Sequence, residues 1–196
     1  MLLATGGFML MPFGSTFTVN NLGISLQKLP WIYMITGAVT FVAGPLLGKL
    51  SDTIGKYQVF CIGSVLGAVV VGVYCHLGVT PLAMVIAINA VLFVAVTCRM
   101  ISASALISAV PDMQDRGAFM SVNASLQQFA GGVASSLAGL IVVQAPGGKL
   151  LHYDLLGYVV MGAMTLVIGL MYPIHRAVMR KEAMAAAKPE VVAAAG

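Results

Sequence analysis

Charged residues are scarce in this chain. Only 8% of its 196 residues are Asp, Glu, Lys or Arg, whereas 60% are hydrophobic. A soluble domain keeps roughly a quarter of its residues charged, because its surface faces water. A surface with so little charge must face lipid, in agreement with the mean hydropathy of +1.00. The scarcity of charge therefore excludes a soluble domain and predicts an integral membrane protein.

The alternation of apolar and polar residues that marks membrane β-strands is also missing. Barrel strands alternate over about ten residues, and the apolar runs of this chain do not. A helix needs about 20 mostly apolar residues to cross the hydrocarbon core. Only helices and closed barrels satisfy their backbone hydrogen bonds there. We therefore expect an all-α polytopic membrane protein.

Six apolar runs divide the chain. They are Leu3–Leu22, Pro30–Leu50, Tyr57–Leu77, Pro81–Ser108, Ala118–Gln144 and Leu155–His175. The joints are short, so neighbouring helices must run antiparallel and pack as one bundle. The last stretch is alanine-rich and less hydrophobic, as frayed chain ends often are. We predict a six-helix transmembrane domain over residues 1–176 and a flexible cytoplasmic tail over residues 177–196.

Small residues recur at spacings that let membrane helices approach closely. Gly63 and Gly67 form one such pair, and Gly131, Ser135 and Gly139 form a longer stripe. We interpret both as helix-packing faces.

Basic residues divide unequally between the two ends of the bundle. With a cytoplasmic N-terminus, the inside joints and the tail hold Lys49, Lys56, Arg116, Arg176, Arg180, Lys181 and Lys188, and the outside joints hold only Lys28 and Lys149. Cytoplasmic loops of membrane proteins are enriched in Lys and Arg. This bias predicts that both termini are cytoplasmic, and the compact loops suggest a bacterial inner membrane. Basic residues at helix ends indicate contact with the bilayer, and we expect no nucleic-acid partner.

Carboxylates are missing from the apolar runs. All six acidic residues lie at joints or in the tail: Asp52, Asp112, Asp115, Asp154, Glu182 and Glu190. Proton-coupled carriers generally need an intramembrane group that titrates, so a coupling acid would have to come from elsewhere. The metal motif H-E-x-x-H and the nucleophile elbow G-x-S-x-G are absent. The three cysteines have no metal-ligand spacing. We expect no enzyme activity, no cofactor and no metal.

One joint concentrates the scarce charge. The stretch GPLLGKLSDTIGKYQV places Lys49, Asp52 and Lys56 within eight positions. Within it, GKLSDTIGK resembles the signature loop of the major facilitator superfamily: glycine, three residues, aspartate, two residues, glycine and a basic residue. The gate loop motif is then Gly48, Asp52, Gly55 and Lys56, and Thr53 departs from the basic residue usual in the family. In that family the loop joins the second and third helices of each six-helix half, on the cytoplasmic side.

The resemblance extends over most of the chain. NNLGISLQKLPWIYMITGAVTFVAGPLLGKLSD resembles the seventh and eighth helices of drug-efflux-like members. PDMQDRGAFMSVNASLQQFAGGVASSLAGLIV resembles their tenth-to-eleventh connection and eleventh helix. The resemblance implies the C-terminal six-helix half of such a carrier, built from 3+3 inverted repeats.

Arg99, in VLFVAVTCRMISASAL, is the only charge deep within an apolar run. An arginine at this depth costs several kcal/mol unless it snorkels or finds a partner. The resemblance implies that Asp52 and Arg99 belong to a charge network that closes the cytoplasmic side, with Arg116 as a third member. The alternative is that Arg99 only snorkels to headgroups and that Asp52 only caps the third helix.

Polar and aromatic residues within the helices are candidates for a central cavity. The resemblance implies that the first and fourth helices line it, which points to Asn89 and Phe93 on the fourth. Ser125 and Gln128 share one face of the fifth helix, and Gln127 lies on an adjacent stripe. A polar face at membrane depth should point into the bundle or a water-filled cavity. Interhelical hydrogen bonding explains this face as well as contact with a solute does.

Two functions remain after these exclusions. The first is a half-size or truncated major-facilitator-type secondary transporter, moving a small apolar or amphipathic solute by alternating access. It would work as a homodimer or with a complementary six-helix half. The second is a non-transporting fragment, or an accessory protein that binds a full carrier. The opening MLLATGG favours this second function, because it enters the first helix without a preceding basic loop.

Overall fold

The computed structural model describes residues 2–194, most of them in helices. The elements are α1 (Leu2–Asn20), the short 3-10 helix η1 (Leu26–Lys28), α2 (Leu29–Ile54), α3 (Lys56–Cys75), α4 (Leu82–Ser108), α5 (Arg116–Ile141), β1 (Val143–Gln144), β2 (Leu150–Leu151) and α6 (Tyr153–Ala194). The two short strands pair antiparallel, with Val143 opposite Leu151. The predicted all-α fold with six long helices is confirmed.

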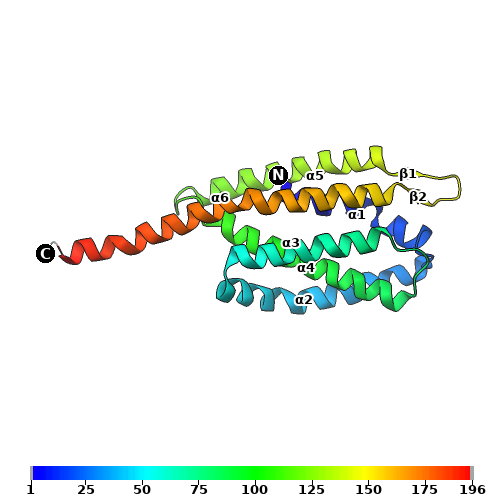
Figure 1. Ribbon diagram of the computed structural model, residues 1–196, viewed down its shortest axis with the longest axis horizontal. Helices are drawn as coiled ribbons and strands as arrows, with labels where there is room; N and C mark the ends of the chain where they lie inside the picture. Colours follow the sequence, from blue (N-terminus) through cyan, green and yellow to red (C-terminus); the bar gives the residue numbers. More distant parts are fainter. Residues whose placement is uncertain (1, 195–196) are drawn as a thin grey trace.

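The six helices form one antiparallel bundle (Figure 1). Within the described chain, four segments are long and apolar enough to cross a membrane: Leu26–Ile54, Lys56–Cys75, Leu82–Ser108 and Tyr153–Lys181. Helices α1 and α5 pack beside them. The α2–α3 joint lies toward the same end of the bundle as the C-terminus, and the β1–β2 hairpin lies at the opposite end. The chain is therefore a multi-pass membrane protein.

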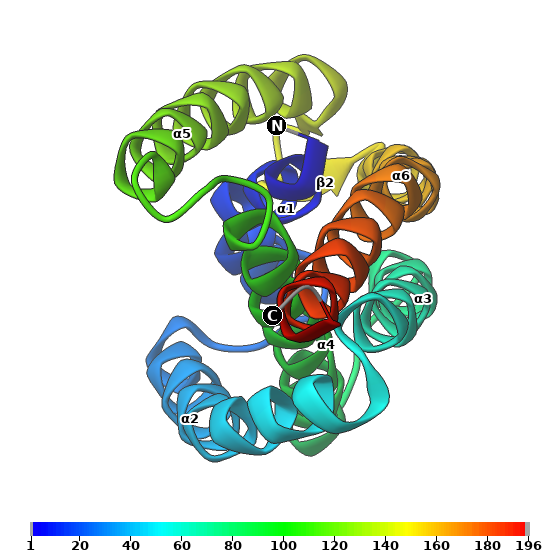
Figure 2. The same cartoon turned by 90° about the vertical axis from the view of Figure 1, so that its left-hand side faces the viewer.

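The packing order of the helices determines what lies in the centre. Seen from one end, Figure 2 shows α1 and α4 in the middle, α3 and α6 together on one side, and α2 and α5 apart on the other. Helix α4 packs against α2 and α3, whereas α1 packs against α5 and α6. The largest buried side chains include Phe17, Phe60 and Leu156, which come from three different helices.

The predicted packing face on α3 contacts α4. A Cβ atom added at Gly63 would lie 3.0 Å from Cβ of Cys98 and 3.1 Å from the carbonyl oxygen of Ala95. At Gly67 the added atom would lie 3.7 Å from Cβ of Ala95. Without a side chain, Gly63 lets the two helix backbones approach closely.

The predicted stripe on α5 is only partly a packing face. A Cβ atom added at Gly131 would lie 2.8 Å from the ring of Phe8 on α1. The hydroxyl of Ser135 donates a hydrogen bond to the Phe8 carbonyl oxygen at 2.9 Å. At Gly139 no described atom lies within 4 Å of the added position. Helices α1 and α5 therefore meet through Gly131 and Ser135, and the stripe does not extend to Gly139.

Helix α6 continues beyond the predicted end of the transmembrane domain at Arg176. Val178 is buried, and the ammonium group of Lys181 donates hydrogen bonds to the carbonyl oxygens of Val110 and Pro111 at 3.1 and 3.2 Å. Ala, Met, Arg, Lys and Glu favour helix, so the helix does not stop where the apolar run stops. The packed part of the chain reaches Lys181, and a flexible cytoplasmic tail beyond it stays a prediction.

The Lys181 contact predicts a pH dependence at this end of the bundle. Its ammonium group lies 2.7 Å from a carboxylate oxygen of Asp112, and this hydrogen bond and charge lower the pKa of Asp112 below its ordinary 3.8. Because the folded pKa is the lower one, the ion pair stabilises the folded state above pH 3.8 and is lost as the pH falls through the lowered pKa. At neutral pH we expect Asp112→Asn to speed amide hydrogen exchange over residues 178–184 by about two- to fivefold.

The matched control is Asp115→Asn, which removes a nearby carboxylate that has no ion pair in the described structure. It should leave exchange in this segment unchanged. The effect of Asp112→Asn on amide exchange should disappear at a pH where Asp112 is protonated in both the folded and the unfolded state. Equal exchange in the two variants at neutral pH would contradict the assignment.

Candidate functional site

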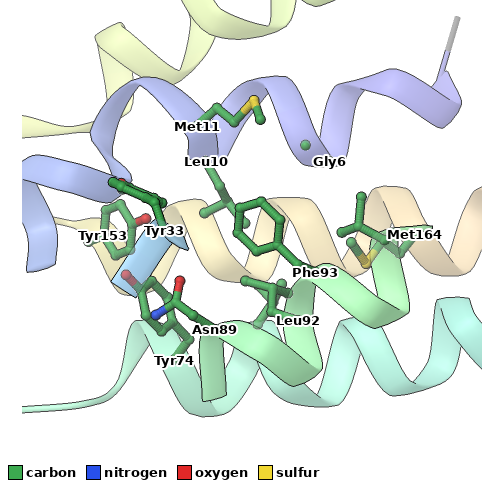
Figure 3. Close-up of a pocket in the computed structure, with 14 residues that line it drawn as sticks. Gly6, Leu10, Met11, Tyr33, Tyr74, Asn89, Leu92, Phe93, Tyr153 and Met164 are labelled. Atoms are coloured by element: carbon green, nitrogen blue, oxygen red, sulfur yellow. The ribbon is translucent and has the colours of Figure 1, made fainter. Parts of the chain in front are cut away.

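A cavity of about 340 Å³ lies between α1, α2, α3, α4 and α6 (Figure 3). Most of its wall comes from α1 and α4. The lining residues are Gly6, Gly7, Leu10, Met11, Gly14, Tyr33, Val71, Tyr74, Asn89, Leu92, Phe93, Val96, Tyr153 and Met164. No charged side chain is among them. Ligand cavities are typically lined by apolar and aromatic groups with a few polar ones, and this wall has that composition.

Polar groups gather at one end of this cavity. Figure 3 shows Tyr74, Asn89 and Tyr153 together there, while Phe93 and Met164 lie toward the other end. The Tyr74 hydroxyl is hydrogen-bonded to the hydroxyl of Thr18 at 2.9 Å. The Asn89 side-chain nitrogen donates to the Val85 carbonyl oxygen at 2.9 Å. The cavity therefore has a polar end and an apolar end.

Tyr153 differs from its polar neighbours. It is 2% exposed, and its hydroxyl oxygen has no hydrogen-bond partner among the described residues. Its ring stacks on Phe17, with centroids 4.0 Å apart and an interplanar angle of 16°. Tyr153 is also the first residue of α6, directly after the β1–β2 hairpin. Packing thus holds the ring in position, and the hydroxyl is buried without a partner among the described residues.

The predicted cavity residues separate into two groups. Asn89 and Phe93 line the cavity. Ser125, Gln127 and Gln128 do not, because α5 packs on α1 through the face that carries Gly131. Gln128 instead lines a shallow hollow on α5 itself, and the hydroxyl of Ser125 donates to the carbonyl oxygen of Ser121 within the helix at 3.1 Å.

The gate loop motif forms the tight joint between α2 and α3. Gly55 has φ of +114°, a conformation that side chains of L residues disfavour, and its N–H donates to the Ser51 carbonyl oxygen at 3.2 Å. Gly48 and Asp52 lie in the last turns of α2, and Lys56 begins α3. The buried Ser51 is hydrogen-bonded to Ser102 of α4, with 3.3 Å between hydroxyl oxygens. The joint is thereby attached to α4.

The predicted charge network of Asp52, Arg99 and Arg116 is not formed in this arrangement. Arg99 is 3% exposed, its Nε donates to the Ser64 hydroxyl at 3.0 Å, and its guanidinium carbon lies 5.9 Å from the centroid of the Phe60 ring. The only ion pair among the described side chains joins Lys181 and Asp112.

The alternative roles predicted for Arg99 and Asp52 are not observed either. Arg99 does not extend to the surface of the bundle, because its guanidinium bonds to Ser64 and lies near the ring of Phe60. Asp52 is exposed, and no side chain caps the start of α3. Arg99 is therefore a buried cation whose neighbours are a hydroxyl and an aromatic face.

The signature loop and the multi-pass bundle agree with a comparison against protein families. The family model described as Major Facilitator Superfamily matches residues 1–194. The chain belongs to the major facilitator superfamily. No curated protein and no solved structure shows significant similarity to it. Members of this superfamily are transporters, which is consistent with the prediction that the chain is not an enzyme.

Sequence reasoning missed the tyrosines of this major facilitator chain. Tyr33, Tyr74 and Tyr153 line the cavity from three different helices, so no local pattern connects them. The signal that the sequence does contain is their position, since each lies near the end of its helix that is farther from the gate loop. Their similar distance from the helix ends would have grouped the three tyrosine hydroxyls with Asn89.

Proposed function

We propose that this chain is a half-size or truncated secondary transporter that moves a small apolar or amphipathic solute by alternating access. The observation that carries the proposal is the cavity of about 340 Å³ beside α1 and α4, with no charged residue in its lining. An uncharged wall favours solutes that lose little hydration on entry. The polar end gives such a solute a place for one hydrogen-bonding group.

We further propose that the working unit contains two six-helix bundles, formed by a second copy of the chain or by a complementary half. The support is the separation of α2 and α5 on one side of the bundle (Figure 2). Large apolar side chains are exposed on both helices, among them Phe41 and Leu46 on α2 and Phe129 and Leu140 on α5. A second bundle would cover this side and enclose the solute.

The proposed location is a cell inner membrane with both termini in the cytoplasm. The antiparallel order of the helices brings the basic residues of the α2–α3 joint, the start of α5 and the end of the α6 span to one end of the bundle. That end would face the cytoplasm, where Lys and Arg are enriched in loops of membrane proteins.

Alternating access predicts that a cavity position is reached from both sides of the membrane. Gly14 lines the cavity, and no described atom lies within 4 Å of a Cβ added there. We expect Gly14→Cys to react with a membrane-impermeant maleimide in right-side-out and in inverted vesicles. The control is Gly169→Cys, where the added Cβ also meets no described atom and which is outside the cavity lining.

Several outcomes separate the proposal from the alternatives. The parent protein gives the background labelling of Cys61, Cys75 and Cys98. The native mass in nanodiscs should correspond to two 20.3 kDa chains, or to one chain with a partner of similar size. Labelling of Gly14→Cys from one side only, in a lone monomer, would overturn the transport proposal and favour a fragment or accessory protein.

A further inference from the structure

The hydroxyl of Tyr153 belongs to the cavity lining and makes no hydrogen bond within the described chain. The oxygen is buried and has no partner among the described residues. A buried hydroxyl without a partner costs free energy that a ligand atom can recover. Packing on Phe17 holds the ring, with centroids 4.0 Å apart, so the hydroxyl cannot easily turn away to find a partner elsewhere.

The neighbouring polar groups do not compete for this hydroxyl. The Tyr74 hydroxyl is bonded to Thr18, and the Asn89 nitrogen is bonded to the Val85 carbonyl oxygen. Figure 3 places Tyr153 at the same end of the cavity as both of these groups. Thr36 has the other buried hydroxyl without a partner in the described chain, but it does not line the cavity. The hydroxyl of Tyr33 also belongs to the cavity lining, but Tyr33 is exposed. Tyr153 therefore carries the buried hydroxyl of this lining that has no partner among the described residues.

We propose that Tyr153 determines the substrate class: an uncharged amphipathic molecule with one hydroxyl or carbonyl group that bonds to the Tyr153 hydroxyl. Its apolar body would pack against Phe93 and Met164 toward the other end. This inference rests on the proposed function, because it places the solute in the same cavity. The uncharged lining disfavours ionic groups, and the one buried hydroxyl of the lining without a partner among the described residues selects one polar head.

A pair of isosteric probes tests this inference on the intact chain in nanodiscs. β-Naphthol and β-methylnaphthalene differ in one group, hydroxyl against methyl, and both are small enough for a cavity of about 340 Å³. The measured quantity is the ratio of their dissociation constants, compared between the parent and Tyr153→Phe. Partitioning into lipid is the same for both proteins and cancels in this comparison. We expect the preference for naphthol to fall by about tenfold in Tyr153→Phe.

Tyr158→Phe is the matched control. It removes a tyrosine hydroxyl from the same helix, but that hydroxyl is bonded to His76 at 3.0 Å and lies outside the cavity lining. It should keep the parent's preference. Melting curves will show that Tyr153→Phe is folded, and we expect it to be at least as stable as the parent without probe, because it removes an unsatisfied hydroxyl.

The outcomes distinguish this inference from the proposed function. Equal preference in the parent and in Tyr153→Phe, with both probes bound, would overturn the role of Tyr153 and leave the solute cavity supported. Failure of both probes to bind the parent would overturn the inference together with the solute-binding part of the proposed function. A preference lost also in Tyr158→Phe would show a general effect on the bundle and overturn the assignment to Tyr153.

Discussion

Gly63→Val is expected to destabilise the bundle by about 1–3 kcal/mol, the cost of overpacking a well-packed interior. The first added atom would already lie 3.0 Å from Cβ and from Sγ of Cys98. It would also lie 3.1 Å from the carbonyl oxygen of Ala95, which belongs to the backbone of α4. A side chain could rotate away from this contact, but a helix backbone cannot. The two helices would have to separate, and the measurement is the unfolding free energy in a denaturant titration.

Gly37→Val is the control for this substitution. Gly37 is exposed in the middle of α2, and no described atom lies within 4 Å of a Cβ added there. Both variants carry the same change in helix propensity, so the difference between them reports the contact with α4. Combining Gly63→Ala with Cys98→Gly should cost less than the sum of the two single changes, since the pair shares one contact. Equal loss of stability for Gly63→Val and Gly37→Val would contradict the close approach.

The helices could be predicted from the sequence because hydropathy is a local property. All six apolar runs became helices, and the Gly63–Gly67 spacing correctly indicated a packing face. Helix ends were less predictable: α2 continues to Ile54 rather than Leu50, and α6 passes His175, because a helix can continue where the lipid-facing run stops. Neighbours across the bundle could not be predicted. The Arg99–Ser64 bond depends on how α3 and α4 rotate about their axes, which one sequence does not specify.

The same limit explains which residues of the cavity could be predicted from the sequence. Asn89 and Phe93 could be named because one helix carries both. The tyrosines that surround Asn89 come from other helices. The serine and glutamine face of α5 was a candidate for the cavity, beside interhelical hydrogen bonding, because its polarity is visible in the sequence. That face lies away from α1, since Gly131 and Ser135 make the contact with Phe8. Polarity along a helix indicates a face, but packing decides which face points inward.

Arg99→Met is expected to stabilise the protein by roughly 1–3 kcal/mol, because a buried arginine without an acid partner is costly in a membrane. The residue lies nine positions before the end of α4, hence about 13 Å from it along the axis. It is 3% exposed, and its hydrogen bond to Ser64 and the ring of Phe60 offset only part of the desolvation cost. Methionine has a similar length and fills an apolar site without charge.

Ser64→Ala provides the opposite test at the same contact. It removes the hydroxyl that accepts the Arg99 bond at 3.0 Å and leaves the guanidinium in place, so it should lower the unfolding free energy by about 1–3 kcal/mol. In the Arg99→Met background the same change should cost much less, because the bond no longer exists. If Arg99→Met instead lowers stability as Ser64→Ala does, then an anionic group must compensate the charge in the folded protein. A gain of stability for Arg99→Met and a loss for Ser64→Ala would show that Arg99 lowers the stability of the bundle. This is expected of a residue that is retained for function rather than for folding.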